Sequence, residues 1–184
     1  NNYLIVRRDE WPLALTADRA RLLCDPNFGV GGDGILEVDH EGDVPRMTVW
    51  NPDGSHAENC GNGIRMVTRH LVRRGDIRGT ATILTGGGPV RVSELDDQRV
   101  RVEMGRAVFP DGETRQRLQT ADGEVEFAYV TTGNPHAIIE HDHPADVVRQ
   151  LGPQIEVDPH FPNRTNVEFI RRESDSAITM RVWE

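Results

Sequence analysis

Short runs in which apolar and polar residues alternate dominate this chain, and such alternation predicts β-strands. Turn-forming residues separate the runs, as at Pro52-Asp53-Gly54 and at Gly86-Gly87-Gly88. Because strands flank the second of these turns, it is interpreted as a hairpin and not as a phosphate-binding loop. The predicted strands are residues 3–7, 35–38, 46–50, 80–84, 90–94, 99–104, 124–130, 137–140, 167–170 and 177–183.

Three segments carry apolar residues at helical spacing instead. Thr16 is expected to cap the first helix, which must end before Pro26. The second is predicted over residues 64–73, and the third opens at Pro144 and is expected to stop at Gly152-Pro153. The pattern therefore predicts an α/β protein of the α+β type. A connector at 105–113 divides it into domains 1–107 and 108–184.

The pattern repeats within the chain at an offset of 133 residues. Asp25-Pro26-Asn27-Phe28 falls on Asp158-Pro159-His160-Phe161 at this offset. Further identical pairs are Asn1 with Asn134, Ile5 with Ile138, Met47 with Met180, Val49 with Val182, and Trp50 with Trp183. Self-similarity at a fixed period indicates a repeated structural unit. We therefore expect two like halves that face each other.

Composition narrows the classes of function. The net charge of −9 disfavours nucleic acid and anionic membranes as partners, and no apolar run approaches the ~20 residues of a membrane span. Two cysteines without framework spacing indicate reduced thiols and a cytoplasmic location. All 21 basic residues are arginine, whereas a pyridoxal-phosphate enzyme needs a lysine for its cofactor. Chemistry at an amino-acid α-carbon would therefore proceed here without that cofactor.

The most informative segment is residues 51–65, in which Cys60 directly precedes Gly61-Asn62-Gly63 and an amphipathic run. This order predicts a thiol at the mouth of a helix N-terminus, where the helix dipole favours the negative charge of a thiolate. The free backbone N–H groups of Gly61, Asn62 and Gly63 could receive a carboxylate. A base and an anion-binding site thus come from four consecutive residues. Cys24, in contrast, is predicted to be a small buried side chain.

Inversion of an α-carbon needs a proton removed from one face and another delivered to the opposite face. A thiolate and a thiol, one from each half, would supply both. The offset puts the counterpart of Cys60 at position 193, beyond Glu184. The residues therefore indicate a cofactor-independent racemase or epimerase. The chain as given is expected to hold one half of its site and not to epimerise alone.

At these residues the chain resembles the diaminopimelate epimerase family over nearly its full length. The motifs that carry the resemblance are the Asn1-Asn2-Tyr3 start, the 29–34 glycine loop, the 51–65 block, 132–136, 151–153, 161–166 and 181–184. The resemblance implies two pseudo-symmetric domains, each a mostly antiparallel sheet curled around a helix, with the second domain incomplete here. It implies conversion of LL-diaminopimelate to meso-diaminopimelate in lysine and peptidoglycan biosynthesis. We expect a small-molecule substrate, and a homodimer is the expected candidate for the assembly.

The resemblance also implies roles for individual residues. Cys60 is implied to be the first catalytic thiol, with carboxylate-binding amides at Gly61 and Asn62. The asparagines Asn51 and Asn166 would bind the distal end of the substrate. Four further residues complete the implied site: Asn1 and Asn134 beside the reacting centre, Glu184 on the substrate ammonium, and His136 nearby. No metal site is expected, because the histidines at 136, 141 and 143 have no metalloenzyme spacing.

Two alternatives stay open at this point. A proline racemase or hydroxyproline epimerase would share the architecture, but such enzymes typically show histidine where Asn62 stands. A catalytically incompetent chain that only binds a ligand or a partner is the alternative from another class.

Overall fold

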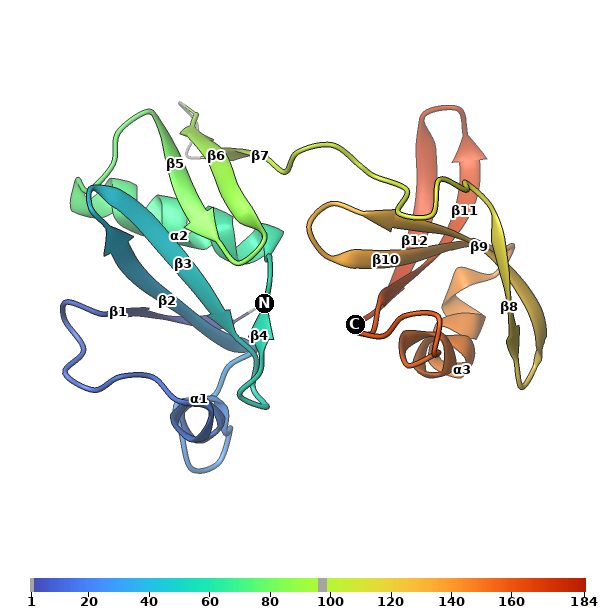
Figure 1. Ribbon diagram of the computed structural model, residues 1–184, viewed down its shortest axis with the longest axis horizontal. Helices are drawn as coiled ribbons and strands as arrows, with labels where there is room; N and C mark the ends of the chain where they lie inside the picture. Colours follow the sequence, from blue (N-terminus) through green and yellow to red (C-terminus); the bar gives the residue numbers. More distant parts are fainter. Residues whose placement is uncertain (1, 96–98) are drawn as a thin grey trace. The chain divides into compact units, whose positions relative to one another are not determined.

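The computed structural model describes residues 2–95 and 99–184, and the chain forms two compact units, Asn1–Gly105 and Arg106–Glu184. The division lies two residues from the predicted domain boundary. Figure 1 labels the helices and strands of both units. Each unit is described by itself below.

The first unit is built on a mixed sheet in the order β1-β2-β3-β5-β6-β7, with β4 paired to β3. Two neighbouring pairs, β1 with β2 and β3 with β5, are parallel, and the remaining pairs are antiparallel. The strands are β1 (Tyr3–Arg7), β2 (Gly34–Glu41), β3 (Val44–Trp50), β4 (His56–Ala57), β5 (Thr80–Thr85), β6 (Gly88–Glu94) and β7 (Val100–Glu103). The hairpin predicted at Gly86-Gly87-Gly88 joins β5 to β6, which confirms that interpretation.

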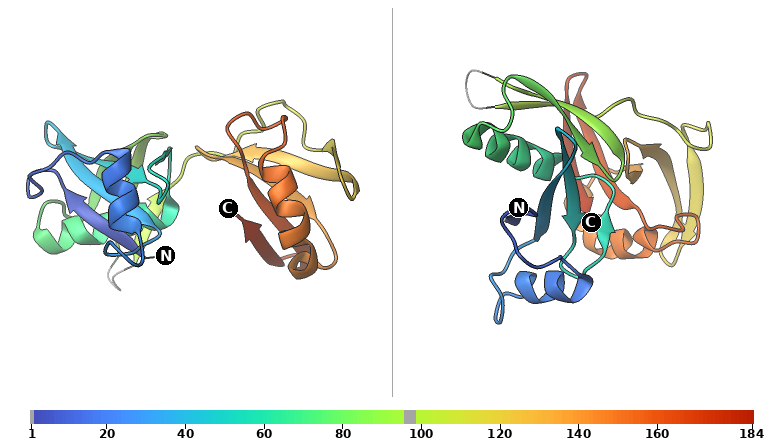
Figure 2. Two further views of the ribbon diagram at one scale, coloured as in Figure 1. Left: turned by 90° about the horizontal axis from the view of Figure 1, so that it is seen from below. Right: turned by 60° about the vertical axis from the view of Figure 1, so that its left-hand side comes forward.

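Two helices, α1 (Ala17–Cys24) and α2 (Gly61–Arg74), pack on opposite faces of β2. Successive strand side chains point to opposite faces. Leu36 therefore packs into the cluster that contains α2, whereas Ile35 packs into the cluster that contains α1. Figure 2 shows both helices beside this sheet. β2 is thus buried on both faces, which explains its nearly continuous apolar start.

The predicted cap of α1 is confirmed, because the hydroxyl of Thr16 accepts the N–H of Arg19 at 3.3 Å. The helix ends at Cys24, and its C-cap residue Asp25 directly precedes Pro26. α2 begins at Gly61, three residues earlier than predicted. Gly75 ends it in the left-handed conformation, with φ of 81°.

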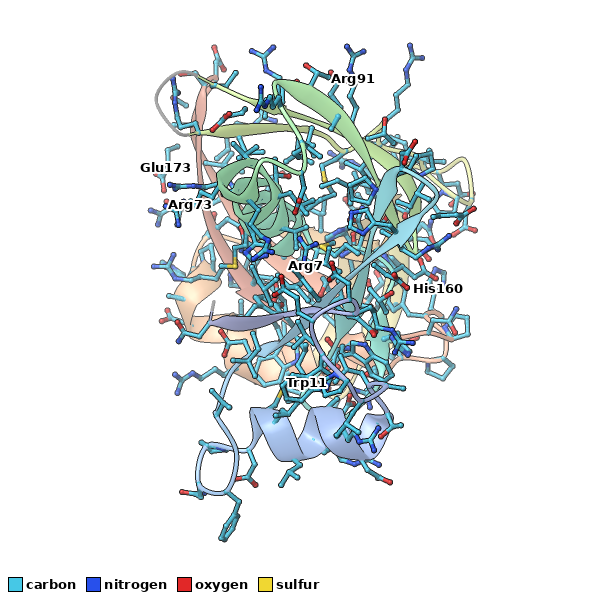
Figure 3. All side chains as sticks on the ribbon, turned by 90° about the vertical axis from the view of Figure 1, so that its left-hand side faces the viewer. Arg7, Trp11, Arg73, Arg91, His160 and Glu173 are labelled. Carbon is cyan, nitrogen blue, oxygen red and sulfur yellow. The ribbon has the colours of Figure 1, made fainter. Side chains whose placement is uncertain are left out.

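Arg7, labelled in Figure 3, is the centre of an ion-pair network that ties the end of β1 to the residues that follow α2. The Arg7 side chain is buried and donates to Asp9 at 2.7 Å and to Asp76. The hydrogen bonds from Arg7 lower the pKa of the Asp9 carboxyl. Tyr3, at the opposite end of β1, lies near the start of α2.

The second unit holds a sheet in the order β12-β11-β10-β9-β8 and one helix, α3 (Pro144–Glu156), which packs on β11 and β12. Only β10 and β11 run parallel. The strands are β8 (Gln116–Thr120), β9 (Gly123–Thr131), β10 (Pro135–Glu140), β11 (Asn166–Ser174) and β12 (Ala177–Trp183). Neither β8 nor β4 was predicted from the sequence pattern. None of the helices in the described residues is long and apolar enough to cross a membrane.

The prediction that α3 stops at Gly152-Pro153 is wrong, since the helix continues to Glu156. A side chain at position 152 would lie 2.6 Å from Cβ and Cγ of Trp183. Gly152 therefore allows close contact between α3 and β12 and does not act as a stop signal. The buried Ile155, one turn further on, gives the last turn of the helix its packing.

The internal repeat is visible in the topology of the two units. The strands β1, β2 and β3 correspond to β10, β11 and β12, with the same parallel and antiparallel pairings. Tyr3 pairs with Gly34 in the first unit, and His136 pairs with Asn166 in the second. The sequence offset between the units is therefore 133 residues from β1 to β10 but 132 residues from β2 to β11. α1 corresponds to α3, because each packs on the equivalent face. The described part of the second unit contains no counterpart of α2.

Candidate active site

Cys60 is the N-cap residue of α2, which confirms the predicted thiol at a helix mouth. Its Sγ accepts the N–H of Gly63 at 3.2 Å, and its own N–H is held by the side-chain oxygen of Asn59 at 3.0 Å. Asn59 is itself buried. The thiol is therefore held by backbone and side-chain contacts on a rigid element and remains partly exposed.

The predicted set of three open amides needs a correction at Gly63. Its N–H is bound to the Cys60 thiol and is not open to a carboxylate. A side chain at 63 would lie 2.7 Å from Cδ2 of Leu36, so glycine is needed there for packing. A side chain at 61 would meet no atom within 4 Å, and Asn62 is exposed beside it. The candidate anion-binding amides are thus those of Gly61 and Asn62.

Tyr3 lies next to the thiol, a neighbour that sequence reasoning missed. Its hydroxyl is 3.6 Å from the Sγ of Cys60, within hydrogen-bonding range for sulfur. One signal could have found it: the 133-residue offset pairs Tyr3 with His136, which was already a candidate.

Asn51 follows β3 at the same end of the sheet. Trp50 pairs with Ile35, next to the Tyr3–Gly34 pair. The Asn51 side chain donates to the Ser55 hydroxyl at 3.0 Å and so stabilises the turn that leads to β4. The first unit therefore brings Asn51, Cys60, Gly61 and Asn62 to one end of its sheet.

The second unit gathers a matching polar group at the start of β10 and β11. His136 Nδ1 lies 2.6 Å from Oε1 of Glu168, and its Nε2 lies 3.1 Å from Oδ1 of Asn134. Asn166 donates to the carbonyl of Pro135 at 3.3 Å. Trp183 pairs with Val167, so the residue after it, Glu184, lies at this same end. The four predicted residues thus lie at the same end of the strands of the second sheet: Asn134, His136, Asn166 and Glu184.

Glu168 is the second residue that sequence reasoning missed. It is buried, and its Oε2 has no hydrogen-bond partner in the described structure. Strand alternation could have found it, because it lies two residues after Asn166 and so on the same face. The predicted residue Asn1 lies outside the described residues.

Cys24 has the opposite character from Cys60, as predicted. It is the last residue of α1, is 5% exposed and packs in the buried cluster that contains Ile35. Burial raises the pKa of its thiol, which keeps it protonated and unreactive. The chain thus carries one thiol suited to chemistry and one suited to packing.

Comparison with known sequences points to one family. Residues 1–110 match the family model of diaminopimelate epimerase. The chain is 35% identical over 199 residues to "Diaminopimelate epimerase 2" of Nostoc sp., covering 100% of this chain and 70% of that protein. It is likewise 35% identical over 203 residues to diaminopimelate epimerase of Teredinibacter turnerae, covering 100% of this chain and 72% of the relative.

Solved structures share the fold at lower identity. A probable proline racemase from Agrobacterium radiobacter, with bound carbonate, superposes with a TM-score of 0.67 at 19% identity. A hydroxyproline epimerase from Agrobacterium vitis gives 0.61 at 18% identity. Both matches cover 88% of this chain, but they cover only 57% and 56% of the two solved chains. Likeness at this identity supports the fold, and the closer sequence matches identify the family. The chain belongs to the diaminopimelate epimerase family.

Proposed function

We propose that this chain contributes the first thiol of a cofactor-independent epimerase that converts LL-diaminopimelate to meso-diaminopimelate. The observation that carries the proposal is Cys60 as the cap of α2, with Sγ on the Gly63 amide and the Gly61 and Asn62 amides beside it. The substrate is a small molecule, and we place the reaction in the cytoplasm. A homodimer is compatible with the proposal.

The chemistry follows from the two-thiol requirement. The Cys60 thiolate takes the α-proton, and the electron pair of the broken C–H bond moves into the substrate carboxylate. The amides at the helix start stabilise the charge that develops there. A thiol on the opposite face then donates its proton to the carbon. The product has inverted configuration, and the two thiols have exchanged protonation states, so the reverse reaction uses them in swapped roles.

The second sheet has an exposed apolar face where the first sheet is covered by α2. Met47 and Val49 are 1% and 2% exposed because α2 covers them, whereas their repeat counterparts Met180 and Val182 are 47% and 38% exposed. We propose that a helix equivalent to α2 covers this face in the active enzyme and carries the second thiol. Its thiol would then lie beside His136, Asn134, Asn166 and Glu184, which we assign to substrate binding.

Exchange of the substrate α-hydrogen tests the proposal. The natural polypeptide that contains these residues is incubated with LL-diaminopimelate in deuterated water, and loss of the α-proton signal is followed by NMR. Cys60→Ala should abolish exchange, while the matched Cys24→Ala should leave most of it. Exchange that survives Cys60→Ala would remove Cys60 from the role of base.

The two alternatives predict different outcomes. A proline racemase-type enzyme would exchange the α-hydrogen of proline and not of diaminopimelate. A chain that only binds a ligand would exchange neither substrate, even when the complete polypeptide is used. The diaminopimelate assignment is preferred because the relatives at 35% identity carry that name.

A further inference from the structure

We propose that Tyr3 is a positioning residue for the Cys60 thiol, and that its hydroxyl hydrogen-bonds the sulfur in both of its protonation states. The proposal deepens the proposed function, since it assumes that Cys60 is the base. The contact joins residues that are 57 positions apart in the chain.

The backbone fixes where the Tyr3 ring can lie. Tyr3 is half-buried in β1 and pairs with Gly34 of β2. Gly34 has φ of 150°, and a side chain there would lie 2.8 Å from Cε1 of Tyr3. The ring therefore lies against the space that the glycine leaves open, and a side chain at 34 would also lie 2.5 Å from the carbonyl oxygen of Trp50.

The sulfur is held from two sides. The Gly63 N–H lies 3.2 Å from Sγ, and the Tyr3 hydroxyl lies 3.6 Å from it. A backbone N–H can only donate, whereas a hydroxyl can both donate and accept. When the sulfur is a thiol, the hydroxyl can accept a hydrogen bond from the S–H group. When the sulfur is a thiolate, the hydroxyl can donate a hydrogen bond to it. Such a partner suits a group that alternates between acid and base.

The repeat supports a specific role for this position. The counterpart of Tyr3 in the second unit is His136, another ring with polar atoms, which contacts Glu168 and Asn134. Both units thus place a hydrogen-bonding ring at the first residue of the equivalent strand pair. The chemistry differs, since the ring is a phenol beside a thiol in one unit and an imidazole beside a carboxylate in the other. The two half-sites are therefore inferred to handle protons differently.

The test uses residues 1–184 and needs no substrate. The rate of Cys60 alkylation by iodoacetamide is measured by peptide mass spectrometry at about pH 7 and at about pH 9.5, where an ordinary thiol is mostly ionised. In Tyr3→Phe the ratio of the rate at about pH 7 to the rate at about pH 9.5 should fall about fivefold, because the charge-assisted hydrogen bond from the hydroxyl to the thiolate is stronger than the one that the hydroxyl accepts from the neutral thiol. Tyr129→Phe, which removes the other tyrosine, is the matched control and should leave the ratio unchanged.

Each outcome decides the proposal. An unchanged ratio in Tyr3→Phe would overturn the proposal. This includes the case in which both rates change by the same factor, because altered access to the thiol scales both rates equally. Rapid alkylation of the buried Cys24 would reveal unfolding. A second measurement then decides: in Tyr129→Phe, where Tyr3 is the sole tyrosine, the Raman tyrosine doublet should change upon Cys60→Ala, and an unchanged doublet refutes the contact. Neither readout depends on epimerisation, so this proposal and the proposed function can fail separately.

Discussion

Gly63 illustrates how one residue serves packing and chemistry together. Its N–H donates a hydrogen bond to the Sγ of the N-cap residue Cys60. Because it has no side chain, α2 can approach Leu36 closely. Three parts of the motif thus have distinct places in the structure or the proposal: the thiol of Cys60 at the helix start, the amides of Gly61 and Asn62 proposed for anion binding, and Gly63 in close packing. This division could not be read from the glycine spacing alone.

Gly63→Ala should destabilise the first unit, because the new methyl group would lie 2.7 Å from Leu36 and 3.1 Å from Sγ of Cys60. We expect a loss of about 1–3 kcal/mol in the free energy of unfolding, as for other overpacked positions. The loss would be measured by urea denaturation followed by tryptophan fluorescence. The matched control is Gly61→Ala, where nothing lies within 4 Å, and it should be neutral or stabilising. Equal effects of the two substitutions would contradict the packing role of Gly63.

At the scale of elements, β3 and β12 are equivalent strands with different surroundings. α2 covers β3, whereas the corresponding face of β12 is open in the described structure, although α3 packs on its other face. The same apolar pattern is therefore buried in one unit and exposed in the other. An exposed apolar sheet face of this kind indicates a docking surface.

Substitution of Met47 and of its repeat counterpart Met180 should show the difference between a covered and an exposed sheet face. In residues 1–184, Met47→Glu should cost about 3 kcal/mol or more, because an unpaired charge would be buried at a 1% exposed position. Met180→Glu, at a 47% exposed position, should change the free energy of unfolding by less than about 0.5 kcal/mol. Urea denaturation of both variants gives the comparison. A large loss in Met180→Glu would argue that this face is already covered.

For the whole molecule, each unit has its own apolar core and an exposed segment joins them. The cores centre on Ile64 and Leu71 in the first unit, and on Phe127 and Phe169 in the second. Residues 105–115 are exposed throughout, although Val108 bridges to Thr131. We expect the two units to fold as separate cooperative units.

Limited proteolysis tests this organisation. Trypsin should cut first at Arg106 or Arg115, because local opening is cheapest in an exposed segment with few packing contacts. Mass spectrometry should then detect two long-lived fragments, and the first fragment should keep Cys24 protected from alkylation. First cleavage inside a strand or helix of either unit would contradict the expectation.

Much of the fold could be predicted from the sequence, because its signals are local. Strand alternation located ten of the strand segments, Thr16 marked the start of α1, and the order of Cys60 and its glycines predicted the helix mouth. The end of α3 was mispredicted because the role of Gly152 depends on Trp183, which is distant in the chain. β8 was missed because its polar sequence has only one buried apolar residue, Leu118.

By itself the sequence determined the thiol, its place at a helix start, the duplication, and the family resemblance, since capping and periodicity act over a few residues. Only the tertiary structure decided which groups meet the thiol and the histidine. Tyr3 reaches Cys60 across 57 positions, and Glu168 reaches His136 across 32. Such contacts depend on strand register, and a shift of one residue would turn each side chain to the other face of its sheet.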